Sequence, residues 1–402
     1  MSAPISDRPR ASVGSPAAAS RLLTPAFVHV LAAQLSIGFG FSLYFLLPKY
    51  LATELQAGPA SIGNVAASGL AAAVATTPLM GYWLDRYGHR KSMALSAVLV
   101  MLASLGMLRV TSVDTWLYAL RLVQGLGFAL GFNAAAAYVA EIAPEGRLGQ
   151  AMGLLGAGSL LTNAIAPALF ESAALRWGWQ PVFGAAAATG VATLLLALSL
   201  PPAPRVASAA HVSSAAVDTP PLRIAIVTAA TGAAFGTLIT FTQPFALARG
   251  AERVSTYLIG YTLGALFVRV GLGSLSDRAG RRRVAQWALA AYGSMALVTA
   301  LLEPRLLFVL GVGFGVAHGF VYPALAALAA EGAHPARRGR TLANFNAAFN
   351  CGAGVALLGG GWVARAAGYP TLFALVGLCT LLSVSSLTAP APRLLAPPES
   401  KR

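Results

Sequence analysis

The sequence predicts an all-α integral membrane protein in which twelve transmembrane helices form two parallel repeats of six. Composition is the first reason: 57% of the 402 residues are hydrophobic and 10% are charged, whereas soluble domains carry about 25% charged residues. The other two reasons are the presence of twelve long apolar runs and of a duplicated loop motif. Because twelve spans of about 20 residues use roughly 250 positions, the composition argues against a soluble enzyme and leaves no room for a sizeable extramembrane domain.

The expected elements follow in order along the chain. Residues 1–21 are rich in Ser, Pro and Ala, lack the apolar stretch of a signal peptide, and are expected to form a cytoplasmic tail. Residues 22–200 are predicted to form one six-helix bundle, 201–221 a Pro- and Ser-rich cytoplasmic linker, 222–388 a second bundle and 389–402 a second cytoplasmic tail. The apolar runs, each long enough to span a bilayer, lie at 24–48, 60–83, 91–109, 114–140, 149–171, 179–200, 222–247, 255–276, 284–303, 305–330, 341–365 and 369–388.

The charge distribution predicts the orientation of these helices. The chain carries 28 Lys and Arg against 13 Asp and Glu, a net charge of +15. When both termini are placed on one side, 19 basic residues fall on that side and seven on the other. The excess predicts cytoplasmic termini, so the basic character does not require a nucleic-acid partner. The two cysteines, Cys351 and Cys379, lie in late apolar runs, and no metal, cofactor or disulfide is expected.

Two loop motifs occur once in each half. Residues 81–91 read GYWLDRYGHRK and residues 273–282 read GSLSDRAGRR, so the two aspartates are 192 residues apart. A second motif consists of a glutamate and, after five further residues, an Arg-x-Gly triplet. Its first copy has Glu141 and RLG at 147–149, and its second copy has Glu331 and RRG at 337–339, so the two glutamates are 190 residues apart. Because equivalent loops are six helices apart, an even number, both copies lie on one side of the membrane. The repeats are therefore parallel.

Over its whole length the sequence resembles transporters of the major facilitator superfamily. The loop motif G-x-x-x-D-R-x-G-[RK]-[RK] carries the resemblance, although His89 replaces the first basic residue of the first copy. Residues 269–282 and the segment AAFNCG at 347–352 resemble bacterial arabinose-efflux-like permeases. The resemblance implies two six-helix bundles around a central cavity that opens alternately to either side. Residues 153–167 lack the Gly-Pro pair typical of drug antiporters, so export rests on overall likeness.

The duplicated loops are predicted to form a cytoplasmic gate. Asp85 and Asp277 can each sit against a helix N-terminus across the bundle interface, and the resemblance places those termini near Thr341 and Gly149 respectively. The alternative is that the loop charges only set topology and turn geometry. The predicted gate comprises Gly81, Asp85, Arg86, Gly88, Arg90, Gly273, Asp277, Arg278, Gly280, Arg281 and Arg269, the last sharing a helix face with Asp277.

A cation deep in the fourth span marks the predicted cavity. Arg121 begins an R-x-x-Q-G-x-G pattern and lies about seven residues, roughly 10 Å, inside the span. It is expected to bind substrate or to assist switching; the alternative is a structural arginine bonded to backbone carbonyls. The predicted cavity is rich in hydrogen-bonding groups and without acids, which suits a polar or anionic solute. Its residues are Gln34, Tyr44, Arg121, Gln124, Asn133, Gln243, His318, Tyr322, Asn346 and Asn350.

The proton pathway is less well defined by the sequence. None of the 13 carboxylates falls in the middle of a span, whereas many proton-coupled relatives carry a buried acid there. The candidates for proton coupling are His318, His29 and Glu171.

These observations favour a secondary active transporter over an enzyme, because no nucleotide loop or nucleophile motif is found. The expected activity is proton-coupled efflux of a small polar or anionic compound. Uptake of a carboxylate or sugar by proton symport or facilitated diffusion is the alternative, and a non-transporting membrane sensor is a third possibility. We expect a monomer in the bacterial inner membrane.

Overall fold

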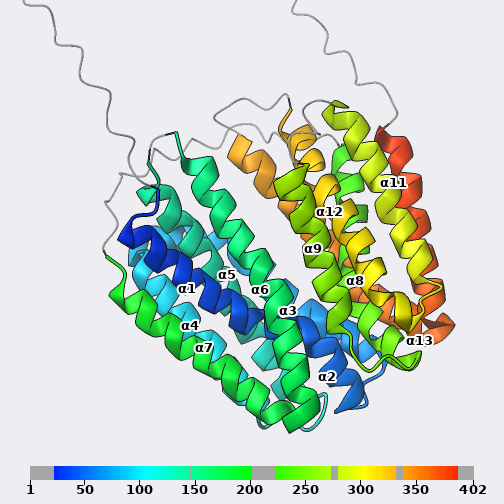
Figure 1. Cartoon of the computed structure of the whole chain (residues 1–402), viewed down its shortest axis with the longest axis horizontal. Helices are drawn as coiled ribbons and strands as arrows, with labels where there is room; N and C mark the ends of the chain where they lie inside the picture. Colours follow the sequence, from blue (N-terminus) through cyan, green and yellow to red (C-terminus); the bar gives the residue numbers. More distant parts are fainter. Residues whose placement is uncertain (1–21, 145, 202–221, 273–278, 332–337, 388–402) are drawn as a thin grey trace, which may run out of the picture.

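The computed structural model describes residues 22–144, 146–201, 222–272, 279–331 and 338–387, and these residues form helices joined by short connections (Figure 1). The predicted tails and almost all of the predicted linker lie outside the described residues. The same holds for three residues of the predicted gate, Gly273, Asp277 and Arg278.

The first half of the chain forms one group of helices. Its first predicted span is a continuous rod built from three segments, α1, the short 3-10 helix η1 and α2. Thr24 caps α1 by accepting a hydrogen bond from the backbone N–H of Phe27 at 3.2 Å. The helices are α1 (Pro25–Ser42), η1 (Leu43–Leu46), α2 (Leu47–Thr53), α3 (Pro59–Tyr87), α4 (His89–Met107), α5 (Thr115–Ile142), α6 (Leu148–Trp177) and α7 (Trp179–Ser199).

The second half forms a second group of helices. Its last two predicted spans are continuous in α13, which is interrupted at Gly368 by non-helical angles of φ 84° and ψ 161°. The helices are α8 (Leu222–Ala248), α9 (Ser255–Gly271), α11 (Arg281–Thr299), η2 (Pro304–Leu306), α12 (Leu307–Ala330), α13 (Arg338–Ser383) and η4 (Val384–Leu387).

Turn glycines repeat between the halves. Gly88 ends α3 with φ 77°, and Gly280 precedes α11 with φ 87°. Gly178 joins α6 to α7 with φ 80°, and Gly368 stands 190 residues later at the equivalent position. A side chain at these angles is strained, which explains why glycine occupies the loop motif in both copies.

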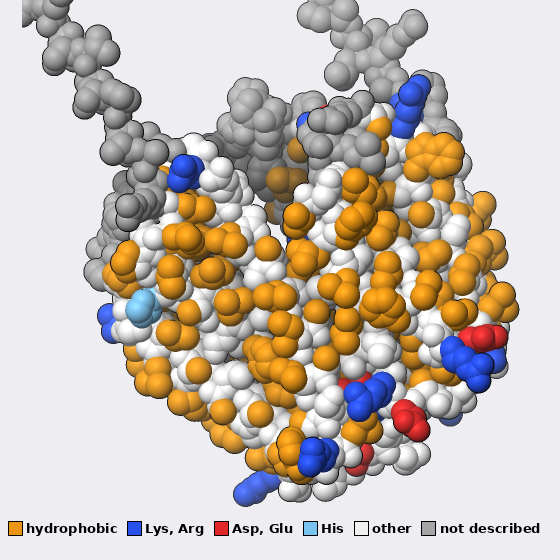
Figure 2. Space-filling view, in the orientation of Figure 1, with side chains coloured by type: hydrophobic (Ala, Val, Ile, Leu, Met, Phe, Trp, Pro, Cys, Tyr) orange, Lys and Arg blue, Asp and Glu red, His pale blue; other side chains and the backbone are white. Residues whose placement is uncertain are grey.

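The predicted membrane character of the helices is confirmed. In the described part of the chain, nine helices are long and apolar enough to cross a membrane, and one of the nine, at 340–387, covers two predicted runs. α9, with 17 residues, and α11, which begins with three arginines at 281–283, are not among them. Large apolar side chains such as Val270, Trp287 and Leu301 are more than three-quarters exposed. Figure 2 shows apolar side chains spread over the visible face, as a surface against lipid requires.

The two groups of helices meet at one end only in Figure 1, near α2, and diverge toward the other end. At the meeting end α3 approaches α13 so closely that a Cβ on Gly63 would lie 2.2 Å from the carbonyl oxygen of Leu357. We call this the contact end. The opposite end, which carries Gly88 and Gly280, is called the motif end. The cavity and the contacts described below lie where the two groups meet.

Candidate functional site

A cavity of about 170 Å³ lies between the two groups of helices. Segments α1 to α3 and α5 line it from the first half, and α8 and α13 line it from the second half. Four of its 18 lining residues have polar side chains, namely Tyr44, Arg121, Thr240 and Asn350. The remaining lining residues are Phe41, Phe45, Leu47, Pro48, Leu51, Ile62, Ala66, Leu70, Phe235, Gly236, Ile239, Phe349, Ala353 and Leu357.

Arg121 provides the positive charge of this cavity. Its Nε donates to the backbone carbonyl of Val65 at 3.3 Å, and one terminal nitrogen donates to the side-chain oxygen of Gln124. The guanidinium also lies over the ring of Tyr44, 5.5 Å from its centroid. No carboxylate in the described part of the chain pairs with it. Arg121 therefore bonds a backbone carbonyl, as the structural interpretation of the sequence predicts, and also lines the cavity, as the functional interpretation predicts.

The structure brings three of the ten predicted cavity residues to the lining, Tyr44, Arg121 and Asn350. Gln34 is buried inside the first half, where its amide nitrogen donates to the hydroxyl of Ser159 at 3.3 Å. Gln124 is the partner of Arg121, and half-buried Asn133 donates to the carbonyl of Ala129 in its own helix at 2.7 Å. Each amide thus makes one bond within the first half, as polar residues inside spans often do, while the buried side-chain oxygen of Gln34 and the amide nitrogen of Gln124 have no hydrogen-bond partner among the described residues.

His318 and Tyr322 belong to an aromatic cluster that contacts Phe235 and Phe349 of the cavity lining, and exposed Asn346 is bonded to Tyr322. His318 is buried, its Nδ1 lies 3.2 Å from the hydroxyl of Tyr292, and its ring centroid lies 5.0 Å from that of Phe235. The hydroxyl of Tyr322 donates to the side-chain oxygen of Asn346. The cluster therefore supports the cavity through Phe235, which does line it.

Sequence reasoning missed the aromatic lining. Phe41, Phe45, Phe235 and Phe349 all line the cavity, which makes it more apolar than the sequence led us to expect. The search for polar residues in apolar spans could not find them, because a phenylalanine facing the cavity and one facing lipid look alike in the sequence.

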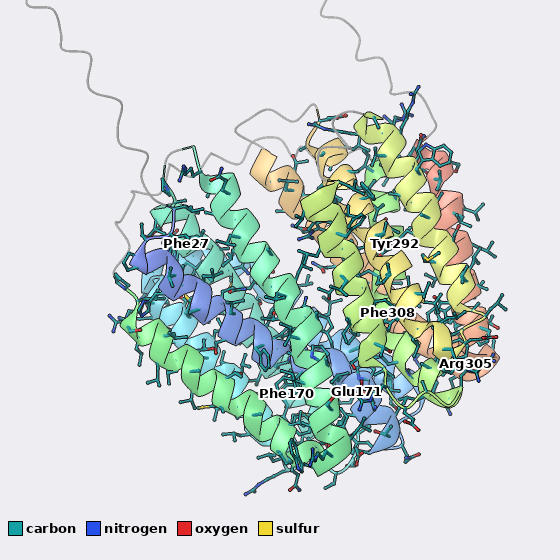
Figure 3. The ribbon with its side chains drawn as sticks, in the orientation of Figure 1. Phe27, Phe170, Glu171, Tyr292, Arg305 and Phe308 are labelled. Carbon is teal, nitrogen blue, oxygen red and sulfur yellow. The ribbon has the colours of Figure 1, made fainter. Side chains whose placement is uncertain are left out.

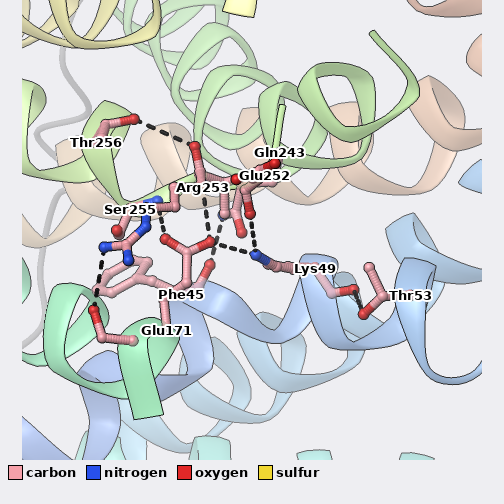
Figure 4. A network of polar contacts seen from close by, with 11 residues as sticks. Phe45, Lys49, Thr53, Glu171, Gln243, Glu252, Arg253, Ser255 and Thr256 are labelled. Carbon is pink, nitrogen blue, oxygen red and sulfur yellow. Dashed lines mark hydrogen bonds and ion pairs between the residues drawn. The ribbon is translucent and has the colours of Figure 1, made fainter. Parts of the chain in front are cut away.

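A network of polar contacts closes the contact end (Figure 4). At its centre is the buried carboxylate of Glu171 on α6, which pairs with the ammonium of Lys49 on α2 at 2.6 Å. The same carboxylate accepts from the backbone N–H groups of Val254 and Ser255, each at 2.8 Å. These two groups open α9, so a side chain of the first half caps a helix of the second half.

Three further bonds join the halves at this end, the longest being the 3.5 Å bond from Arg253 to the hydroxyl of Ser172. The ammonium of Lys49 donates to the backbone carbonyl of Glu252 at 2.7 Å. The buried amide of Gln243 on α8 donates to the carbonyl of Phe45 at 2.6 Å. Gln243 was predicted to line the cavity, and it instead joins the two halves beside Phe45, which does line it. In Figure 3 Glu171 lies between the two groups of helices, at the contact end.

The three proton-coupling candidates lie in different surroundings. Glu171 is part of the closed contact end, and His318 is part of the aromatic cluster. His29 is half-buried on α1, with no hydrogen bond or ion pair to another described residue. Within the part of the chain that the structure describes, no group of His, Cys, Asp and Glu is arranged to hold a metal ion.

At the motif end the described gate residues are exposed or paired within their own half. Asp85 is exposed and forms no hydrogen bond or ion pair with any described residue. His89 pairs with Glu141 at 2.8 Å, and Arg281 pairs with Glu331 at 3.6 Å. Thus the two repeated sequence motifs contact each other in each half, and the histidine of the first copy occupies the place of an arginine in the second.

The other described gate residues follow the same pattern. Arg86 donates to the hydroxyl of Tyr82 at 3.1 Å on its own helix, and Gly81 and Arg90 are exposed. Arg269, on α9, is exposed.

Curated relatives are similar over part of the chain. The alpha-ketoglutarate permease of Escherichia coli K12 is 29% identical over 292 residues, which are 65% of this chain and 66% of that protein. The multidrug resistance protein MdtL of Escherichia fergusonii is 27% identical over 40% of each chain. The chain thus matches just under two thirds of the length of the first relative and well under half of the second.

Solved structures match nearly the whole chain. The nucleoside transporter NupG superposes with a TM-score of 0.75 at 15% identity, over 91% of this chain and 98% of that one. The human organic anion transporter MFSD10 gives a TM-score of 0.65 at 17% identity, over 90% and 100%. These likenesses show the fold.

The family assignment comes from a family model. The model described as Major Facilitator Superfamily matches residues 30–268 and again residues 224–402. The two matches together cover both halves of the chain. With apolar helices throughout and the duplicated loop motif, this multi-pass membrane protein belongs to the Major Facilitator Superfamily of transporters.

Proposed function

We propose that this chain is a secondary transporter that carries a small organic anion across the bacterial inner membrane by alternating access. Family membership makes it a transporter of small solutes. The observation that carries the finer proposal is Arg121, a cation in the cavity between the halves without a carboxylate partner among the described residues. A positive charge at that depth is costly, and a bound anion would offset the cost.

The relatives support an anionic solute. The curated permease is named for alpha-ketoglutarate and the human structure for organic anions. MdtL is named for multidrug resistance, but a cationic drug would face the guanidinium of Arg121 without a carboxylate to pair with. Charge complementarity therefore favours an anion over a cation for this cavity.

Alternating access follows from the asymmetry of the two ends. Contacts join the halves at the contact end, while the helices diverge toward the motif end. The positive-inside bias supports a cytoplasmic motif end and cytoplasmic termini, so the described conformation is the inward-facing one. In the opposite state bundles 22–200 and 222–388, joined by the linker at 201–221, separate at the contact end. Asp85 then caps the start of α13 near Thr341, as the resemblance implies.

Protons supply the driving force in this proposal, and the direction is efflux. Of the three candidates, Glu171 is the one whose protonation weakens contacts between the halves, because its carboxylate accepts both backbone bonds from the start of α9. Protonation from outside would therefore favour opening of the contact end. Uptake by proton symport or by facilitated diffusion is the alternative, and we propose that the monomer suffices for either.

The test is transport in proteoliposomes with and without an imposed pH gradient. A panel of anionic, neutral and cationic solutes is offered while internal pH is followed. We expect anion flux accompanied by proton movement, and at least tenfold less flux in Arg121→Gln. Arg305→Gln is the matched control, since Arg305 is exposed on the outside of the second group of helices (Figure 3). Preferential flux of cations, or full anion flux in Arg121→Gln, would contradict the proposal. Anion flux without proton movement would favour the facilitator.

A further inference from the structure

We infer that the cavity selects a solute with one anionic group attached to an aromatic body, in preference to a dicarboxylate or a sugar. The inference rests on the proposed function and specifies the class of anion. It concerns the same cavity of about 170 Å³ between the halves.

The number of charges is limited by the lining. Arg121 is the one charged side chain among the described lining residues. It lies on the wall formed by the first half, over the ring of Tyr44. A single carboxylate can pair with its guanidinium. A second carboxylate on the same solute would lie among phenylalanine and aliphatic side chains, where an unpaired charge is strongly disfavoured.

The body of the solute is defined by the rings around it. Phe41 and Phe45 line the cavity from the first half, and Phe235 and Phe349 line it from the second. The members of each pair contact one another, with ring centroids 5.8 Å and 5.5 Å apart. Aromatic pairs gain stability beyond the area they bury, so a flat ring placed between these four is favoured over an aliphatic chain. Because the rings come from both halves, such a solute would contact both.

The volume suits one ring. An apolar cavity of about 150 Å³ is known to bind benzene, and this cavity is of similar size. It therefore accommodates a single six-membered ring with a carboxylate directed at Arg121.

A sugar fits the same lining poorly. The hydroxyl of Tyr44 is already bonded to Ser104 at 3.0 Å, and Arg121 already donates to Val65 and Gln124. Thr240 and Asn350 remain as polar partners on the opposite wall. Several hydroxyl groups of a sugar would consequently be buried without hydrogen bonds, and each such group is costly.

The test is equilibrium binding of solutes to the purified full-length protein in lipid nanodiscs. Binding is measured in place of transport because weak acids cross bilayers without a transporter. Benzoate is compared with acetate, which has the charge without the ring, and with benzamide, which has the ring without the charge. Succinate and alpha-ketoglutarate test a second carboxylate, and xylose tests a sugar. We expect benzoate to bind at least tenfold more tightly than each of the others.

Variants separate the contributions of charge and ring. Arg121→Gln should remove the preference for benzoate over benzamide. Phe349→Leu should weaken benzoate binding roughly two- to tenfold and leave acetate binding unchanged. The matched control is Phe308→Leu, on the exposed side of α12 away from the cavity (Figure 3).

The outcomes distinguish this inference from the proposed function. Tighter binding of succinate or alpha-ketoglutarate than of benzoate, lost in Arg121→Gln, would overturn the inference and leave the organic-anion proposal standing. Binding of benzamide or xylose as tight as that of benzoate, or no binding of any anion, would overturn both. A Phe349→Leu variant that does not fold leaves the wild-type panel decisive.

Discussion

Replacing Glu171 by alanine should open the contact end. The carboxylate accepts from two backbone N–H groups of the other half, at Val254 and Ser255, and pairs with Lys49 within its own half. When the halves separate at this end, the two backbone bonds break while the pair with Lys49 can persist. The two backbone bonds therefore stabilise the state in which the contact end is closed relative to the state in which it is open.

The size of the expected shift follows from the strength of these two hydrogen bonds. Hydrogen bonds to a charged group contribute about 1.5 kcal/mol each at the lower end of their usual range. Losing both removes about 3 kcal/mol from the closed contact end, which shifts the equilibrium roughly 100-fold toward opening at that end. In the closed state the variant also leaves the Lys49 ammonium, with 5% of its side chain exposed, bonded to the carbonyl of Glu252 alone. That burial adds to the shift in the same direction.

The assay is labelling of a cysteine in the cavity from outside intact cells with a membrane-impermeant thiol reagent. Thr240 lines the cavity, so Thr240→Cys is introduced after the two exposed native cysteines, Cys351 and Cys379, are replaced by serine. We expect Glu171→Ala to raise the labelling rate by one to two orders of magnitude, and acidification of the outside to raise the rate in the parent but not in the variant.

The matched control is the neighbouring Ser172→Ala. Ser172 accepts one long bond from Arg253 at 3.5 Å, and exposed contacts of this kind contribute little. A labelling rate in Glu171→Ala equal to that of the parent would show that the capping of α9 does not hold the halves together.

Three further predictions concern other parts of the molecule. Asp85→Asn should reduce transport with normal membrane insertion, because Asp85 forms no bond with any described residue in this state and is proposed to cap α13 in the opposite one. A normal transport rate in this variant would contradict the proposed cap. Glu171→Gln should flatten the pH dependence of transport. His318→Gln should leave that dependence unchanged, since no described carboxylate contacts the imidazole. The reverse result would place the proton at His318. Gly63→Ala should slow transport, because the added Cβ would lie 2.2 Å from the carbonyl oxygen of Leu357. The control Gly354→Ala has open space beside it and should not slow transport. Equal rates in the two variants would show that the close approach of α3 and α13 is dispensable.

Much of the fold could be predicted because its signals are local. Apolar runs give the helices, and the period of about 190 residues gives the parallel repeat, which the glycine pairs Gly88 with Gly280 and Gly178 with Gly368 reproduce in the backbone. Arg121 could be identified because a cation inside an apolar run is rare. Helix ends were less exact: α3 continues to Tyr87, and α13 joins two runs across Gly368.

The contacts between halves could not be predicted for a physical reason. Glu171 meets the backbone N–H of Ser255, 84 residues away, and that meeting depends on how two bundles pack. The apolar wall of the cavity is equally hidden, since Phe235 lines the cavity while Phe267 on the next helix is 61% exposed on the surface. Likewise Gln34, Gln124 and Gln243 are all amides in spans, and packing alone decides that none of them lines the cavity.

Paired spin-label distances report whether the two ends of the protein open in alternation. One pair of labels replaces Gln56 and Ala366 at the contact end, and the other replaces Lys91 and Arg283 at the motif end, all four being exposed. Adding a transported anion or lowering the pH should lengthen the first distance and shorten the second in the same sample. Two distances that stay fixed, or that change in the same direction, while transport proceeds would show that the two ends do not alternate.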